Sequence, residues 1–140
     1  MANTRPSIAD KRRTFQQLHE AGCFVIPNPW DVGSARFLQS LGFKALATTS
    51  SGFAWSQGYP DGAIPRDLAL AHLQEIVAAT DLPVNADFQS GFALDAAGVA
   101  ESVRLAVKRG VSVLYATIVP PAEQGAVGGE QGGSDRNPAL

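Results

Sequence analysis

Short apolar segments alternate with longer segments of helical periodicity over residues 7–119 of this chain. The apolar segments are rich in Val, Ile and Thr and are bounded by Gly or Pro, which predicts strands. They are 23–27, 45–49, 82–86 and 111–119. Helices are predicted over 7–21, 32–41, 66–79 and 96–109. Alternation of strand and helix favours a parallel sheet packed against helices, either a doubly wound sheet or a (β/α)₈ barrel.

Helix-capping residues precede three of the predicted helices. Ser7 and Asp10 have the spacing of a capping box, in which each side chain bonds the backbone N–H of the other residue. Asp31 and Asp95 precede two later helical segments as N-cap candidates. No Gly-x-Gly-x-x-Gly follows the first predicted strand, which weakens a dinucleotide-binding interpretation.

The composition excludes several classes of function. The formal net charge of −2 argues against nucleic-acid binding, and the basic run "KRR" at 11–13 is interpreted as a solvated helix face. No apolar run is long enough to span a bilayer or to serve as a signal-peptide core. The single cysteine, Cys23, suits a reducing compartment and is expected to be a buried small side chain. We therefore expect a cytoplasmic protein that binds neither nucleic acid nor membranes.

The third predicted strand ends in two polar side chains, Asn85 and Asp87. Side chains alternate along a strand, so these two point the same way and Ala86 points the opposite way. In parallel α/β folds, sites lie beyond the carboxyl ends of the strands. Carboxylate and amide oxygens there suit Mg²⁺, which keeps water or substrate in its other positions. The alternative is that Asn85 caps a turn and Asp87 begins a helix, with no metal.

The segment after the second predicted strand carries candidate substrate-binding groups. Thr49, Ser50, Ser51 and Gly52 offer hydroxyls and closely approaching backbone N–H groups, which bind carboxylate or phosphate oxygens. Asp61 follows in "GYPDG", which is either a loop that folds over the site or an ordinary turn.

Aromatic and histidine side chains near these segments have competing interpretations. Trp30, Phe53 and Trp55 either wall a pocket, with Trp30 contacting substrate, or cover an edge of the core. His72 lies in the apolar stripe of helix 66–79 and is interpreted as a structural residue rather than a base.

Over roughly residues 14–111 the chain resembles the isocitrate lyase/phosphoenolpyruvate mutase superfamily. The segments that carry the resemblance are "GCFVIPNPWDVGSARFLQSLGFKALATTSSGFAWSQGYPDG", "LPVNADFQSGF" and "GVAESVRLAVKRGV". The resemblance implies a (β/α)₈ barrel with an added N-terminal helix. It also implies an Mg²⁺-dependent enzyme, with Mn²⁺ as an alternative ion. Such enzymes cleave, form or rearrange C–C or P–C bonds of small 2-oxo or 2-hydroxy acids through an enolate-like intermediate.

The resemblance also implies roles for individual residues. The segment 50–52 would hold substrate oxygens, and Asp61 would contribute to a gating loop and to the water shell of the metal. Asn85 and Asp87 occupy the two metal positions of the family's Asp-x-Asp motif.

Three departures from the family pattern change these expectations. The first metal position is Asn85, whose amide offers an oxygen without the charge of Asp. The segment 111–119 lacks the carboxylate that the family carries after its fourth strand, and strands five to eight have no counterpart. We therefore expect residues 1–119 to be the N-terminal half of a barrel, truncated and of low activity. Residues 120–140, rich in Gly without apolar periodicity, are expected to be a disordered tail.

Two other functions remain open. A half-barrel leaves its outer strands unpaired, which favours a non-catalytic protein that self-associates as a homo-oligomer. A module that binds small dicarboxylates without chemistry is the third interpretation.

Overall fold

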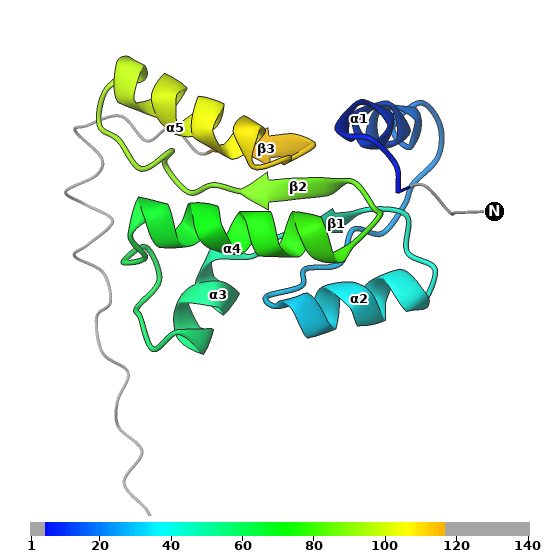
Figure 1. The fold of residues 1–140 in the computed structure, drawn as a ribbon, viewed down its shortest axis with the longest axis horizontal. Helices are drawn as coiled ribbons and strands as arrows, with labels where there is room; N and C mark the ends of the chain where they lie inside the picture. Colours follow the sequence, from blue (N-terminus) through cyan, green and yellow to red (C-terminus); the bar gives the residue numbers. More distant parts are fainter. Residues whose placement is uncertain (1–4, 117–140) are drawn as a thin grey trace, which may run out of the picture.

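A computed structural model describes residues 5–116 of the chain (Figure 1). Its elements are α1 (Ile8–Gln17), α2 (Val32–Ser40), β1 (Leu46–Ala47), α3 (Ser50–Ser56), α4 (Arg66–Ala79), β2 (Val84–Asp87), α5 (Ala96–Lys108) and β3 (Val113–Tyr115). Within this part of the chain the strands form one parallel sheet in the order β1-β2-β3. The predicted α/β class is therefore confirmed. The predicted tail, 120–140, and the end of the last predicted strand lie outside the described residues.

Strand β2 is the centre of the sheet and decides which side chains face the helices. Asn85 pairs in register with Ala47 of β1 and Val113 of β3. Ala86 is fully buried, whereas Asn85 and Asp87 are each half-buried, so the burial alternates along the strand. Asn85 and Asp87 therefore share one face of the sheet, as the spacing predicts.

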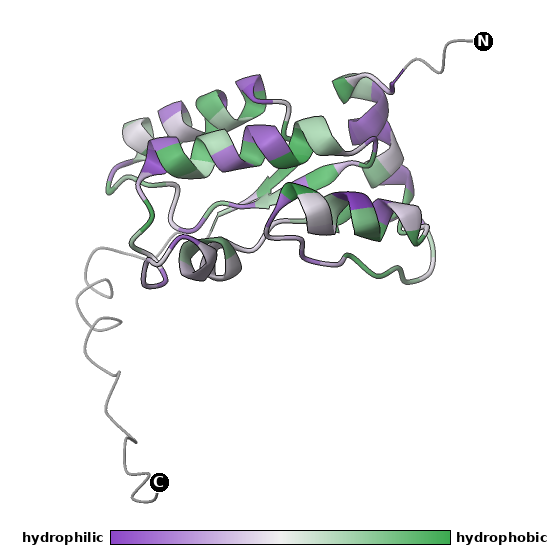
Figure 2. Ribbon diagram, turned by 60° about the horizontal axis from the view of Figure 1, so that its bottom comes forward, coloured by the Kyte–Doolittle hydropathy of each residue, from purple (hydrophilic) through white to green (hydrophobic). Residues whose placement is uncertain are grey.

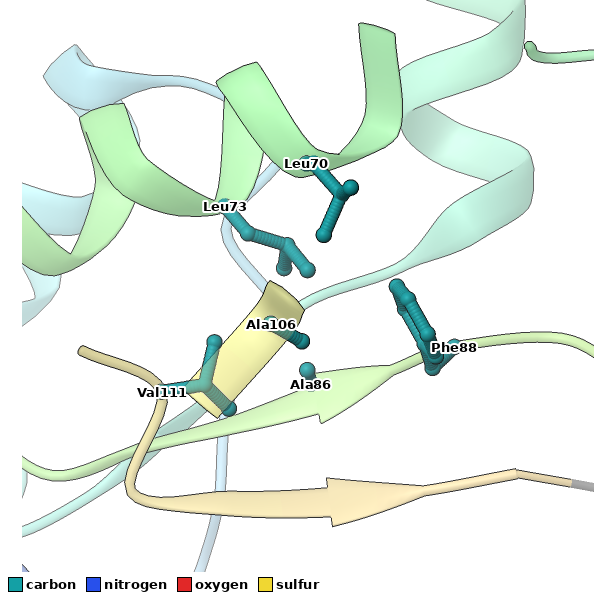
Figure 3. Packing of buried hydrophobic residues seen from close by; sticks show 6 residues of the cluster. All are labelled: Leu70, Leu73, Ala86, Phe88, Ala106 and Val111. Carbon is teal, nitrogen blue, oxygen red and sulfur yellow. The ribbon is translucent and has the colours of Figure 1, made fainter. Parts of the chain in front are cut away.

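Helices α2, α4 and α5 pack against the face that Ala86 occupies. One buried cluster joins α4, β2 and α5 (Figure 3): Leu70, Leu73, Ala86, Phe88, Ala106 and Val111. A second joins α2 and α4 to β1 and β2: Ala35, Leu46, Ile76 and Val84. Hydrophobic and hydrophilic residues interleave along the helices, as expected when each helix buries one face (Figure 2). None of the helices within residues 5–116 has the length and hydrophobicity needed to cross a bilayer.

The segment 23–27, predicted as the first strand, is not a strand in the structure. It runs beside β1, and Ala47 N donates to the carbonyl of Pro27 at 3.0 Å. Pro27 and Pro29 have no N–H to donate, so a regular ladder cannot continue past this contact. Because the segment does not enter the sheet, Cys23 is exposed rather than buried, contrary to the expectation.

The region after β1, for which the sequence predicts no helix, begins with the short helix α3. Thr49 is its N-cap, and its Oγ1 accepts from Gly52 N at 3.2 Å. Ser and Gly in the first turn have low helix propensity, which hides the helix from a local reading of the sequence. Phe53 and Ile64 are buried together, so packing rather than propensity stabilises this helix.

Helix α1 is anchored to the C-terminal end of α4. Lys11 Nζ donates to the Thr80 carbonyl at 2.7 Å, and the Arg5 guanidinium donates to the carbonyls of Ala78 and Thr80, both at 2.8 Å. Carbonyls at the end of a helix lack intrahelical partners and attract cations. Burial lowers the pKa of Lys11. Figure 1 places α1 and α3 toward opposite ends of β2, so this anchor is remote from the carboxyl ends of the strands.

Helices α3 and α4 meet through a stacked aromatic pair. The rings of Phe53 and His72 have centroids 3.7 Å apart and an interplanar angle of 5°. His72 is 7% exposed, and its burial lowers its pKa from 6.5 to about 4, although Asp31 opposes the shift. The ring is therefore neutral at pH 7, and its packing agrees with the predicted structural role.

We expect the free energy of unfolding to fall as the pH is lowered from about 6.5 to about 4. In this window the unfolded chain binds a proton at His72 that the folded chain does not, so acid favours the unfolded state. Urea unfolding of the wild type and of His72→Phe, which keeps a ring against Phe53, measures this contribution. The free energy of unfolding should depend less steeply on pH in the variant than in the wild type. Equal slopes for the two proteins would show that His72 does not contribute to the pH dependence of stability.

Candidate functional site

The carboxyl ends of β1 and β2 meet in a set of hydrogen bonds around Asp87. Its Oδ2 accepts from Ser50 N at 2.9 Å, and its backbone N–H donates to Thr48 Oγ1 at 3.0 Å. Thr48 N donates to the carbonyl of Asn85 at 2.9 Å. Asp87 Oδ1 accepts a longer bond of 3.4 Å from Gln89 N. The Asp87 carboxylate is therefore fixed beside the first turn of α3.

An open pocket lies at this junction, and its empty volume of about 310 Å³ includes open solvent. Its polar lining comes from the strand ends, α3 and α4: Thr48, Thr49, Ser50, His72, Asp87 and Gln89. Its apolar lining is Phe53, Ile64, Ala69, Leu73 and Phe92. Apolar walls combined with convergent polar groups are typical of sites for small molecules.

The structure brings three predicted site residues together at this pocket, namely Thr49, Ser50 and Asp87. Ser51 is adjacent, with its Oγ 3.4 Å from Thr49 Oγ1. The backbone N–H groups of Ser50 and Gly52 already donate, to Asp87 and Thr49 respectively. The hydroxyls of this segment are therefore better placed than those two amides to receive a ligand.

The other predicted site residues are not among those lining the pocket. Trp30 is 50% exposed. Asp61 is exposed in a turn in which Ala63 N donates to the Pro60 carbonyl at 3.2 Å, as the ordinary-turn interpretation predicts. Asn85 lies two residues before Asp87, and its Oδ1 is buried without a hydrogen-bond partner among the described residues.

The oxygens of Asn85 and Asp87 can be compared with the needs of Mg²⁺. Within residues 5–116 no three His, Cys, Asp or Glu side chains gather as a metal-binding cluster. Asp87 offers one carboxylate, and the unpartnered oxygen of Asn85 lies on the same face of β2. Mg²⁺ commonly takes one or two protein carboxylates and fills its other positions with water and substrate oxygens. The pair fits such a site, with less charge than two carboxylates would give.

The pocket also includes residues that the sequence did not single out as site residues, Thr48, Gln89 and Phe92. Gln89 and Phe92 have φ of 49° and 57°, the left-handed region that non-glycine residues seldom adopt. Gly91 between them also has a positive φ, and a Cβ there would lie 2.9 Å from Val99 Cγ1. Such backbone conformations concentrate at functional sites. The available signal was the polar, glycine-containing "FQSG" directly after β2.

Comparison with known proteins relates this arrangement to a family. A protein from Mycobacterium tuberculosis of unassigned function is 34% identical over 101 residues, which cover 71% of this chain and 39% of that protein. The 2-methylisocitrate lyase of Halalkalibacterium halodurans is 31% identical over 90 residues, covering 64% of this chain and 29% of the lyase. The crystal structure of a candidate lyase/mutase from Burkholderia cenocepacia matches with a TM-score of 0.73 and 50% identity, covering 74% and 38% of the respective chains.

The chain spans about two fifths of the length of the Mycobacterium relatives. The family model for phosphoenolpyruvate phosphomutase matches residues 15–115, which include the candidate site from Thr49 to Asp87. The resemblance found in the sequence is therefore confirmed. The chain belongs to the phosphoenolpyruvate phosphomutase family, within the superfamily that also contains isocitrate lyase.

Proposed function

We propose that the strand ends around Asp87 serve an Mg²⁺-dependent lyase or mutase reaction on small 2-oxo or 2-hydroxy acids. The reaction breaks, forms or rearranges a C–C or P–C bond through an enolate-like intermediate. The family match and the identity to a 2-methylisocitrate lyase support this reaction class. The observation that carries the proposal is the Asp87 carboxylate, fixed beside Ser50, with the unpartnered oxygen of Asn85 on the same face of β2.

Asp87 and Asn85 would hold the ion, Mg²⁺ or Mn²⁺. When bound, the ion supplies Lewis acidity that stabilises negative charge developing on the oxygens of the acid. Asp87 carries the only charge of the pair, so affinity should depend mainly on this residue. Asp61 would join the water shell of the ion when its loop folds toward the pocket.

The surrounding residues would bind and orient the acid. The hydroxyls of Thr49, Ser50 and Ser51 are hydrogen-bond donors for carboxylate oxygens. Gly52 keeps the first turn of α3 close to Thr49, since a Cβ at this position would lie 2.8 Å from Thr49 Cγ2. Trp30 would cover bound substrate, and closure of the Asp61 loop would exclude the water that protonates an enolate.

A second candidate function is self-association without catalysis. In the described part of the chain, β1 and β3 are the outer strands of the sheet. Outer strands can pair with another chain, although in β1 the N–H and carbonyl of Ala47 already have partners at Pro27 and Asn28. Helix α2 and its C-cap also expose Phe37 and Leu41, which are 62% and 59% exposed and lie about one helical turn apart. These features favour a homo-oligomer, with or without catalytic activity.

We expect the 140-residue chain to bind Mg²⁺ in the presence of oxalate, a planar mimic of the enolate. Asp87→Asn keeps a hydrogen-bond acceptor for Ser50 but removes the charge, and should weaken Mg²⁺ binding by about tenfold or more. Asn85→Asp adds a second charge and should tighten binding. Isothermal titration calorimetry measures all three proteins, and a parallel series uses Mn²⁺.

The matched control is Asp67→Asn, the same change at a carboxylate whose side chain is 89% exposed at the start of α4. It should bind Mg²⁺ and oxalate like the wild type. Equal affinities for the wild type and the Asp87 and Asn85 variants would contradict the assignment of these residues to the metal.

We expect weak or absent turnover by the purified 140-residue chain on 2-methylisocitrate, oxaloacetate or phosphonopyruvate with Mg²⁺. An eight-stranded barrel needs about 200 residues or more, so this length cannot close one within a single copy. Pyruvate, oxalate and phosphate release measure the reaction. Robust turnover would show that the residues present suffice for catalysis.

We expect the chain to form a homo-oligomer in solution, because large apolar side chains remain exposed in the part of the chain that the structure describes. Size-exclusion chromatography with light scattering gives the mass directly. Phe37→Asp tests the exposed face of α2 without touching the sheet. A monomer at every concentration measured would exclude self-association.

A further inference from the structure

Gln89 carries a side chain at a backbone position that favours glycine. Gly91 N donates to the Phe88 carbonyl at 2.9 Å, which closes a four-residue turn directly after β2. Gln89 is the second residue of this turn and has a φ of 49°. Turns with a positive φ at this position are dominated by Gly, Asn and Asp, because other side chains strain the backbone there. The chain therefore keeps a glutamine where glycine would be less strained.

Contacts of the neighbouring residues hold this turn in place. Phe92, which has a φ of 57°, packs edge-on against buried Phe88, with ring centroids 5.0 Å apart. Gly91 lies so close to Val99 of α5 that a Cβ at Gly91 would clash with it. A strained backbone persists where its surroundings determine it, and such positions cluster at functional sites. The strain at Gln89 therefore points to a role for its side chain.

The side chain of Gln89 is accessible from the pocket. Gln89 lines the pocket and is half-buried. Within residues 5–116 its side-chain amide makes no hydrogen bond, and neither of its polar atoms is enclosed. In this it differs from His72, whose Nε2 is enclosed. The amide offers two N–H donors and one carbonyl acceptor to a ligand in the pocket.

Gln89 lies beside the carboxylate of Asp87, the candidate metal ligand. Gln89 N donates to Asp87 Oδ1 at 3.4 Å, and Ser50 N donates to Asp87 Oδ2 at 2.9 Å. A ligand bound at this carboxylate therefore has Ser50 on one side and Gln89 on the other. Among the described residues that line the pocket, none is Lys or Arg, so an acid must be held by the ion and by neutral donors. Among those same residues, Gln89 carries the only side-chain amide.

We propose that Gln89 is a substrate-binding residue, whose side-chain N–H donates to an oxygen of the acid held at Asp87. The left-handed backbone at this position is kept because the contact needs a side chain that glycine lacks. Binding is thereby obtained at a cost in stability. This inference rests on the proposed function, because it adds a contact to the acid that the ion binds.

Gln89→Gly tests both halves of the proposal at once, because it relieves the strain and removes the amide. The midpoint of thermal unfolding without ligand should be about 2–4 °C higher than that of Gln89→Ala, the reverse of the usual order of these two residues. In calorimetric titrations with saturating Mg²⁺, both variants should bind oxalate about tenfold or more weakly than the wild type. This is the loss expected for one hydrogen bond to a charged group.

Gln89→Met separates the hydrogen bond from the space that the side chain fills. It keeps the length of the side chain without its polar atoms, and should weaken oxalate binding as Gln89→Ala does. The matched control is Gln17→Met, the same change at an exposed glutamine of α1, which should bind oxalate like the wild type. Mg²⁺ titrated without oxalate should bind equally to all these proteins, because the amide contacts the acid rather than the ion.

The possible results distinguish this inference from the proposed function. If the wild type binds oxalate with Mg²⁺ and Gln89→Met binds it equally well, the role of Gln89 is overturned and the proposed function stands. The same holds if the variants lose affinity for Mg²⁺ alone as much as for oxalate, or if Gln89→Gly is less stable than Gln89→Ala. If the wild type binds neither Mg²⁺ nor oxalate, both are overturned.

Discussion

The hydrogen bonds that join the end of β1 to β2 determine where a site can exist in this molecule. Thr48 donates its N–H to the carbonyl of Asn85 and accepts from the N–H of Asp87, so it fixes the register of the two strands. That register buries Ala86 against Leu73 and leaves Asp87 on the opposite face. A slip of one residue would turn the carboxylate into the apolar cluster. Core packing and site geometry are therefore consequences of the same pairing.

Much of the fold follows from local patterns in the sequence. Strand–helix alternation predicts the parallel sheet, and the caps at Ser7, Asp31 and Asp95 form as predicted. The elements that the sequence did not predict correctly depend on tertiary contacts. The segment 23–27 has strand composition, but Pro27 and Pro29 limit its pairing with β1. Helix α3 has weak propensity and depends on burial of its apolar side, which a local pattern does not reveal.

The site was partly predictable for a similar reason. Ser50 and Asp87 could be expected together because the ends of parallel strands meet at one edge of a sheet. Whether His72 lines the pocket depends on how α4 lies against α3, and no neighbouring residue in the sequence indicates it. A lone histidine in an apolar stripe usually indicates a core residue. Asp61 lies in an exposed turn, so its position relative to a bound acid depends on how its loop moves.

The anchor between α1 and α4 has a consequence for the order in which the chain folds during translation. The partners of Arg5 and Lys11 at Thr80 lie 75 and 69 residues later in the chain. A helix of ten residues is marginal in water by itself. Helix α1 is therefore synthesised well before α4 but gains its stabilising contacts only after α4 has been synthesised, so it becomes fixed later than its place in the chain suggests.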